Sequence, residues 1–280
     1  LLSVDLVGCT SEKEMVRRVQ AYQAKSNKPV LVGMGWDQSL WTDNEFPDNL
    51  LLNAAFPDTP VCLYRIDGHS ALLNDAFIEI LGDFEVPNGG AAIQNNSGRY
   101  TGLFVDAALQ LLEGFIPKFS NAEMKAKLVE VQNELLSYGV TGVHEAGVDA
   151  NQRELLIEMV DENSLHLNVY AMLSPSDKNK KFAKQNGIYR NQNLLIRSFK
   201  AYVDGALGSR GALLKEPYHD HPNYKGLSLS SAKELASLRD FCLSVDYQLN
   251  CHGIGDAAVS RILGMCKEAF KRKADHRFRV

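Results

Sequence analysis

The alternation of hydrophobic and polar positions changes along this chain at about residue 105. After that point, short apolar runs of strand length alternate with longer amphipathic segments. The pattern predicts strands at 140–147, 165–173, 194–205 and 247–255, helices at 106–116, 121–139, 151–164, 176–187, 231–246 and 256–273, and the start of a further strand at 278–280. Strands that alternate with helices are typical of parallel βαβ units. The second half therefore predicts a parallel sheet wound in one direction.

The first half of the chain has a less regular pattern. Residues 11–25 open with Ser11 and Glu14 in the spacing of a capping box and continue with a helical pattern. Two β-rich runs follow, at 29–35 and 60–66, and turn-rich segments fill most of the sequence between and after them. We expect residues 1–28 to form a lead-in helix, 29–105 an irregular inserted α+β lobe, and 106–280 the α/β segment.

Polar side chains recur at the carboxyl ends of the predicted strands. They are His144, Lys200, Asp204 and His252, together with Glu145 and Asp256. Active sites of (β/α) barrels and of open α/β sheets are built at that edge, and a lysine or histidine inside a buried strand is costly without a partner. The pattern favours a functional site. Taken singly, however, His252 is more typical of a hydrogen-bonded core histidine, Lys200 can extend its ammonium into water, and His144 can pair with Glu145.

Lys200 is followed by the Gly-rich sequence "ALGSRGALLKEPY", which lets the backbone approach a ligand closely. Burial lowers the pKa of a lysine, and the neutral amine can then take up carbon dioxide. The resulting carbamate can bridge two divalent metals as a carboxylate would.

Composition narrows the classes of partner. The net charge of −4 provides no basic field, so nucleic acid and anionic membranes are not expected as partners. No apolar run approaches the roughly 20 residues that span a bilayer. The five cysteines show no paired spacing, so we expect buried free thiols, which fit a reducing compartment such as the cytoplasm. The compartment itself stays open, because the sequence does not begin with methionine.

Six motifs together resemble one protein family. They are "GMGWDQSLW", "DGHSALLND", "GRYTGLFVDAA", "YGVTGVHEAG", "FKAYVDGALGSRGALLKEPY" and "CHGIGDAAV". In this order, over residues 4–280, they are similar to the amidohydrolase superfamily. The closer resemblance is to its branch of metal-dependent hydrolases that includes N-substituted formamide deformylase and the YtcJ-like proteins.

The resemblance implies a TIM (β/α)₈ barrel with one or two divalent metals, zinc in the first instance, at its C-terminal face. In this comparison 140–147 is barrel strand 2, 165–173 strand 3, 194–205 strand 4, 247–255 strand 5, and 278–280 opens strand 6. Lys200 and His252 then match the family's metal ligands on strands 4 and 5. The chain would be a partial barrel of about strands 2–6, with the inserted lobe between strands 1 and 2.

The departures from the family pattern are equally specific. No HxH pair occurs near the start of the chain, where the family carries its pair on strand 1, and the chain stops at Val280, where the family's strand-6 histidine would follow. We therefore expect a central fragment lacking both ends, in which Lys200 is an unmodified amine and metal is absent or weakly bound, since zinc prefers four donors.

For the intact enzyme we expect a metal-activated water to attack the carbonyl carbon of an amide-type small molecule and break a C–N bond. We assign catalytic roles to His69, His144 and Asp204, and substrate binding to Trp36, Asn74 and Arg210. The alternative for the lobe residues is that they only pack the inserted lobe against the barrel. Two further alternatives stay open: a catalytically incomplete fragment, and a non-catalytic α/β domain that binds small molecules. A homo-oligomer also remains open.

Overall fold

A computed structural model describes residues 3–26, 28–117 and 120–280. The chain has a mixed α/β fold with parallel strands, and it divides into two compact units. Unit 1 comprises Leu1–Pro117 and Asp204–Leu229, and unit 2 comprises Lys118–Val203 and Ser230–Val280. The first boundary between the two units lies at Pro117. The loop that follows Lys200's strand belongs to unit 1.

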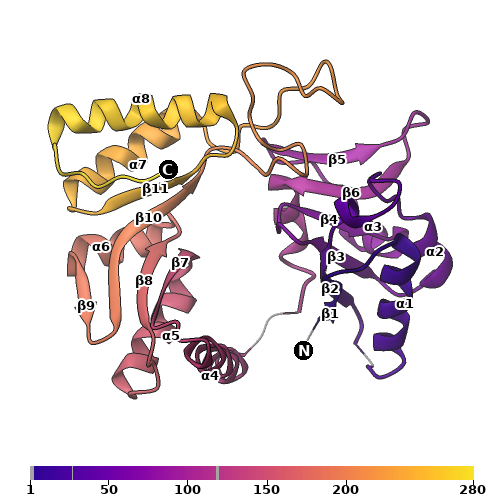
Figure 1. Cartoon of the computed structure of the whole chain (residues 1–280), viewed down its shortest axis with the longest axis horizontal. Helices are drawn as coiled ribbons and strands as arrows, with labels where there is room; N and C mark the ends of the chain where they lie inside the picture. The colour runs from indigo at the N-terminus through magenta and orange to yellow at the C-terminus, as the bar shows by residue number, and fades with distance from the viewer. Residues whose placement is uncertain (1–2, 27, 118–119) are drawn as a thin grey trace. The chain divides into compact units, whose positions relative to one another are not determined.

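Unit 1 contains a six-stranded sheet, so the first half of the chain is more regular than its sequence indicates (Figure 1). The strands are, in spatial order, β1 (Val4–Asp5), β2 (Leu31–Trp36), β3 (Val61–Arg65), β4 (Ser70–Leu73), β6 (Tyr100–Asp106) and β5 (Gly90–Gln94). The first three are parallel neighbours, and the last three pair antiparallel. Its helices are α1 (Glu12–Gln23), α2 (Leu50–Ala55), α3 (Asp75–Leu81) and the 3₁₀ helices Gln38–Leu40 and Ala107–Leu112.

Alternating side chains of the unit 1 strands build two hydrophobic clusters. In β3, Val61 and Leu63 join the cluster that contains Met15 of α1, whereas Cys62 joins the cluster that contains Phe77 of α3. This is the period of two expected of a strand with both faces covered. The cysteines at positions 9, 62, 242 and 251 are buried free thiols, and Cys266 is partly buried.

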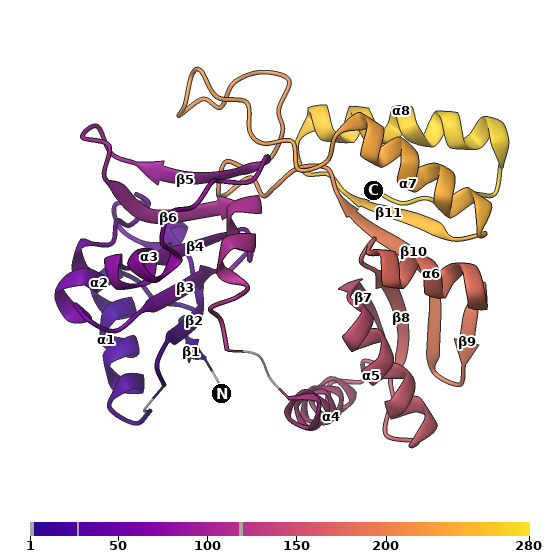
Figure 2. The same cartoon turned by 180° about the vertical axis from the view of Figure 1, so that it is seen from behind.

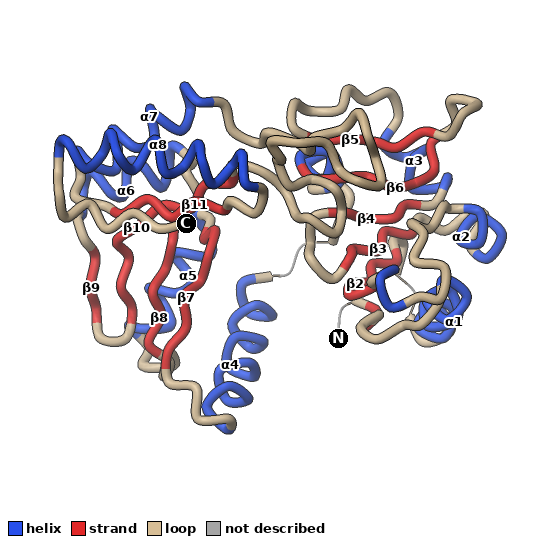
Figure 3. The backbone as a smooth tube through the Cα atoms, turned by 45° about the horizontal axis from the view of Figure 1, so that its top comes forward, coloured by secondary structure: helices blue, strands red, loops and turns tan. Residues whose placement is uncertain are grey.

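Unit 2 contains the parallel sheet expected from the sequence (Figures 1 and 3). The order is β11 (Gln248–His252), β10 (Leu194–Tyr202), β8 (Asn168–Leu173) and β7 (Gly142–Val148), with all neighbours parallel. The sequence did not predict β9 (Tyr189–Asn191), which pairs antiparallel with β10. Arg279, in the expected further strand, forms a parallel bridge to Asn250 of β11.

Helices join the parallel strands of unit 2, as Figure 2 shows from behind. They are α4 (Asn121–Ser137), α5 (Ala150–Asp161), α6 (Asp177–Asn186), α7 (Ala232–Ser244) and α8 (Asp256–Arg272). Capping boxes open α4, α5 and α7, with Ser120, Asp149 and Ser231 as N-caps. No helix among the described residues is long and apolar enough to cross a membrane.

Candidate active site

The two faces of the unit 2 sheet have different chemistry. In β10, Phe199 packs against Phe241 of α7 at a ring distance of 5.6 Å. Because successive strand residues point to opposite faces, Ser198 and Lys200 face away from that helix. In register with Lys200 on β11 lies Asn250. The face opposite the helices is therefore polar.

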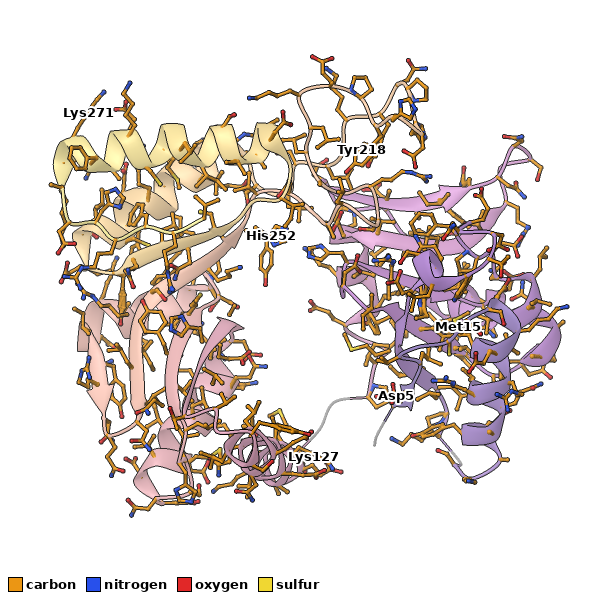
Figure 4. All side chains as sticks on the ribbon, in the orientation of Figure 1. Asp5, Met15, Lys127, Tyr218, His252 and Lys271 are labelled. Atoms are coloured by element: carbon orange, nitrogen blue, oxygen red, sulfur yellow. The ribbon has the colours of Figure 1, made fainter. Side chains whose placement is uncertain are left out.

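Lys200 and His252 lie close to the carboxyl ends of neighbouring strands on this polar face, as the sequence predicted. His252 is the last residue of β11, labelled in Figure 4, and is in register with Tyr202. The ring centroids of Tyr202 and His252 are 5.6 Å apart, and Lys200 Nζ lies 5.1 Å from the Tyr202 ring. Tyr202 thus lies next to both expected metal ligands.

The Lys200 amine is only partly exposed. Burial is the largest influence and lowers the pKa of Lys200; Cys251 opposes it, and the charge of Arg279 adds to the lowering. The net lowering favours the neutral amine, the form that reacts with carbon dioxide.

His144 does not lie at the carboxyl end of its strand, which corrects its expected position. It is the third residue of β7, in register with Tyr170, and the two rings lie 4.9 Å apart. Its Nδ1 lies 3.1 Å from Nη1 of Arg279, and the Arg279 guanidinium lies 5.2 Å from the Tyr170 ring. Arg279 also donates through Nε to the Asn250 side chain at 2.8 Å. His144 therefore belongs to a polar cluster within the sheet.

In unit 1, His69 is tightly held beside a buried carboxylate. Its ring Nδ1 lies 2.7 Å from Asp106 Oδ1, and the Asp106 side chain is fully buried while that of His69 is 17% exposed. The hydrogen bond with Asp106 raises the pKa of His69, burial opposes this, and the charges of Asp106, Asp67 and Asp204 reinforce it. The sequence pointed to His69 but not to Asp106.

A glycine-rich loop, Gly205–Gly211, packs against that carboxylate within unit 1. A Cβ atom at Gly205 would lie 2.2 Å from Asp106 Oδ2, and one at Gly211 would lie 2.1 Å from it. A Cβ at Gly208 would meet the guanidinium of Arg65 at 3.0 Å. The loop therefore requires glycine where its backbone covers the two charged groups.

Asp204, expected to be catalytic, is fully buried in unit 1. Its Oδ2 accepts a hydrogen bond from the backbone N–H of Leu213 at 2.8 Å. This bond ties the two ends of the Gly-rich loop together, so the described contact of Asp204 is structural.

Trp36 and Asn74, expected to bind substrate, are both fully buried. Trp36 donates through Nε1 to the carbonyl of Leu63 at 2.7 Å. Asn74 caps α3 and makes four hydrogen bonds to the backbone, with N–H groups of Val61 and Phe77 and carbonyls of Phe56 and Thr59. The described contacts of both residues lie within the lobe and hold it together.

Arg210, the third expected substrate-binding residue, is paired within unit 1. It donates through Nε and Nη2 to Asp220 at 3.0 and 2.9 Å, and its guanidinium lies 5.4 Å from the ring of Phe46. The hydrogen bond from Arg210 lowers the pKa of Asp220. An anionic substrate group would have to compete with Asp220 for this arginine.

Two residues of these polar clusters, Asp106 and Arg279, were not identified from the sequence, because the local sequence around each has an ordinary structural explanation. Asp106 ends a strand and precedes a turn of helix, the usual place of an N-cap, yet its side chain makes no cap hydrogen bond. Arg279 lies in a predicted strand of only three residues, too short to assign a face.

The donors for a metal are incomplete within residues 3–26, 28–117 and 120–280. No group of three or more histidine, cysteine, aspartate or glutamate side chains there could hold a metal ion. Lys200 and His252 are donors of suitable type, the lysine only after carboxylation. They supply part of the four donors that zinc prefers.

Comparison with known proteins identifies the family of this chain. A model of the amidohydrolase family matches residues 2–279. Curated relatives include Protein LONG AFTER FAR-RED 3 of Arabidopsis thaliana, 28% identical over 100% of this chain and 51% of its own length, and the putative amidohydrolase YtcJ of Bacillus subtilis strain 168, 26% identical over 98% and 53%. The chain thus spans about half the length of these relatives.

Solved structures are similar as well. An uncharacterized metal-dependent hydrolase from Pyrococcus horikoshii OT3 is 26% identical, with a TM-score of 0.67 over 95% of this chain and 52% of that protein. One from Pyrococcus furiosus is 29% identical, with a TM-score of 0.63 over 96% and 54%.

Proposed function

Because this chain belongs to the amidohydrolase family, we propose that it forms part of a metal-dependent hydrolase that cleaves C–N bonds of small amide-type substrates. The observation that carries the proposal is the position of Lys200 and His252. They lie near the carboxyl ends of adjacent parallel strands, on the polar face of the sheet. That edge is where α/β enzymes build their sites.

We assign the fold to a partial TIM barrel, in which β7, β8, β10 and β11 are barrel strands 2–5. Four parallel neighbours in chain order, joined by helices, support this assignment. In barrel terms the chain then has a lead-in helix in 1–28, an inserted lobe in 29–105 and a barrel segment in 106–280.

The metal proposed here is zinc, held by His252 and by carboxylated Lys200. The chemistry of these two donors fits the group, although they are fewer than a complete set. When bound, the metal would lower the pKa of a water ligand and polarise the substrate carbonyl. Tyr202, 5.1 Å from Lys200 Nζ and 5.6 Å from the His252 ring, would wall this position and hold the two side chains in place.

The remaining polar residues take different roles in the proposal. His69 is proposed as a catalytic residue of the intact enzyme, and its raised pKa favours the protonated ring, which donates hydrogen bonds. His144 would orient Arg279 within the sheet. Asp204 would hold the Gly-rich loop, the role that its contact with Leu213 supports.

A second candidate function is a small-molecule binding domain without turnover. The incomplete donor set among the described residues favours it for the 280-residue chain by itself. The two candidates differ in whether a protein with additional flanking sequence binds metal and releases an amine from its substrate.

The test compares this chain alone with the same chain extended by whatever its reading frame encodes on either side. Both are assayed for amine release from N-formyl amines, linear amides and cyclic amides, and for bound metal by elemental analysis. We expect metal and turnover in the extended protein, and loss of both from it in Lys200→Ala and His252→Ala. Lys267→Ala, at an exposed position of α8, serves as the control. Turnover that survives both ligand substitutions would refute the proposal.

A further inference from the structure

We propose that Asp106 is a positioning residue for His69, and that the glycine loop 205–211 closes over its carboxylate to keep it there. The catalytic significance rests on the function proposed above. The positioning itself rests on contacts within unit 1 alone.

The backbone already brings the two residues together. His69 precedes β4 and Asp106 ends β6, and the pairing of these strands continues one step beyond Ser70 and Val105, because the Asp106 N–H donates to the His69 carbonyl at 2.8 Å. On its other side, the His69 N–H donates to Asp67 Oδ1 at 2.9 Å. The sheet therefore fixes the His69 backbone before the side chains meet.

The side-chain contact then fixes the ring. An ionised carboxylate can only accept hydrogen bonds, so the 2.7 Å contact places a hydrogen on His69 Nδ1. Nε2 consequently lies on the side of the ring opposite Asp106. A histidine whose tautomer is set in this way can present Nε2 in a constant direction, which catalysis by a histidine requires.

Asp106 adopts a backbone conformation that argues for such a role. Its φ of 51° and ψ of −119° are favoured by glycine, and they cost another residue about 1–3 kcal/mol. A non-glycine residue is kept in such a conformation where its side chain is needed. The side chain here is fully buried and makes no helix cap, and its described bond is to the His69 ring.

The loop supplies the last part of the arrangement. With Cβ positions 2.2 and 2.1 Å from Asp106 Oδ2, neither Gly205 nor Gly211 can bear a side chain without moving the carboxylate. This loop directly follows β10, the strand that carries Lys200, along the chain. A side chain at Gly205 or Gly211 would displace the Asp106 carboxylate, and with it the group that holds the His69 ring.

The first test measures His69 directly in the 280-residue chain and needs no turnover. The imidazole ¹⁵N spectrum is recorded across pH, with the His69 signals assigned through His69→Gln. We expect the neutral ring to carry its hydrogen on Nδ1. In Asp106→Asn the pKa of His69 should fall, because the bonded negative charge is removed. Asparagine has the same shape as aspartate, so we expect the fold to be retained.

The control must separate a bonded charge from a nearby one. Asp67 and Asp204 also raise the pKa of His69, and Arg65 binds Asp67 at 2.6 Å. Asp67→Asn should lower the pKa less than Asp106→Asn and leave the tautomer unchanged. An equal or larger fall in the pKa of His69 in Asp67→Asn, or a neutral His69 ring that still carries its hydrogen on Nδ1 in Asp106→Gly, would overturn the proposal. Asp106→Gly relieves the backbone strain, so it keeps the chain folded.

The loop is tested by Gly205→Ala, with Gly114→Ala as the matched control, because an added Cβ at Gly114 meets nothing within 4 Å. Gly205→Ala should shift the His69 signals toward those of Asp106→Asn, and Gly114→Ala should leave them in place. His69 signals unmoved by Gly205→Ala would contradict the coupling of loop and ring.

Where a protein with turnover is in hand, Asp106→Asn should lower kcat about tenfold or more, with a smaller change in KM. A rise in KM alone would overturn positioning during the reaction. If no turnover is found for the unaltered protein, the proposed function fails while the ¹⁵N measurements still decide the positioning.

Discussion

Arg279 Nη1 lies 3.1 Å from Nδ1 of His144, across the polar face of the unit 2 sheet. A guanidinium has only donors, so His144 Nδ1 must accept. The neutral His144 ring therefore carries its hydrogen on Nε2, the opposite arrangement to His69. The chain thus holds two histidines in two different tautomers, each set by one neighbour.

The first prediction concerns that tautomer. At about pH 8, where an ordinary histidine is neutral, the ¹⁵N spectrum should show His144 protonated on Nε2. Arg279→Ala should convert this into a mixture of tautomers, because nothing then donates to Nδ1 from that side. Arg279→Lys, which keeps a donor and a charge, serves as the comparison. An Nδ1-protonated ring in the unaltered chain would show that the contact is not a hydrogen bond.

The second prediction concerns Asn74. Its side chain is fully buried and makes four hydrogen bonds to the backbone, so Asn74→Ala should lower the free energy of unfolding by about 3 kcal/mol. Urea unfolding measures this. Asn186→Ala, at an exposed helix end with one hydrogen bond to Phe182, should cost well under 1 kcal/mol. Equal losses in the two variants would argue against Asn74 as a structural residue.

The third prediction concerns Glu12, the first residue of α1. Burial, and then the charges of Asp48 and Asp43, raise the pKa of Glu12 from 4.5 to about 7. The folded chain therefore keeps this proton at pH values where the unfolded chain has lost it. The contribution of Glu12 to stability is present below pH 4.5 and is lost as the pH rises through about 7.

Glu12→Gln should accordingly raise the unfolding midpoint near pH 8 and change it little near pH 4. Thermal unfolding at the two pH values measures the difference. Glu85→Gln removes a negative charge from an exposed loop position of the same unit and should show no such dependence on pH. A gain from Glu12→Gln that is the same at both pH values would contradict the prediction.

The fourth prediction concerns carboxylation of Lys200. With the described donors incomplete, the 280-residue chain should keep Lys200 as a free amine when ¹³C-labelled bicarbonate is added, and no carbamate signal should appear in the ¹³C spectrum. In the extended protein, with zinc added, the carbamate signal should appear, and Lys200→Ala should remove it. A carbamate signal from the 280-residue chain alone would disprove the prediction.

The second half of the fold was predictable because each strand there is a buried apolar run between amphipathic helices. Val169, Ala171 and Leu173 alternate in β8 with residues of the other face, and the capping residues Ser120, Asp149 and Ser231 mark where helices begin. The order β7, β8, β10, β11 then follows from right-handed crossovers, and it is confirmed.

The first half was not predictable in the same way. Strands β4 and β6 lie in sequences rich in glycine and asparagine, and β6 becomes a strand through pairing with distant β4, where Phe104 lies in register with Ala71. Local propensity carries little of that information. The site shows the same limit: a histidine or lysine at a strand end can be picked from its neighbours, whereas Asp106 gains its meaning only from contact with His69 and the loop.

Unit 1 is assembled from two stretches of chain that are far apart in the order of synthesis. About a hundred residues separate Asp106 from the glycines that cover it, which corresponds to roughly 5–20 s of translation. During that interval the strands β7, β8 and β10 are made, while the buried carboxylate of Asp106 and the guanidinium of Arg65 still lack their cover. The nascent first unit must therefore wait for part of the second before it can close, and a ribosome paused before Gly205 would hold it in an unfinished form.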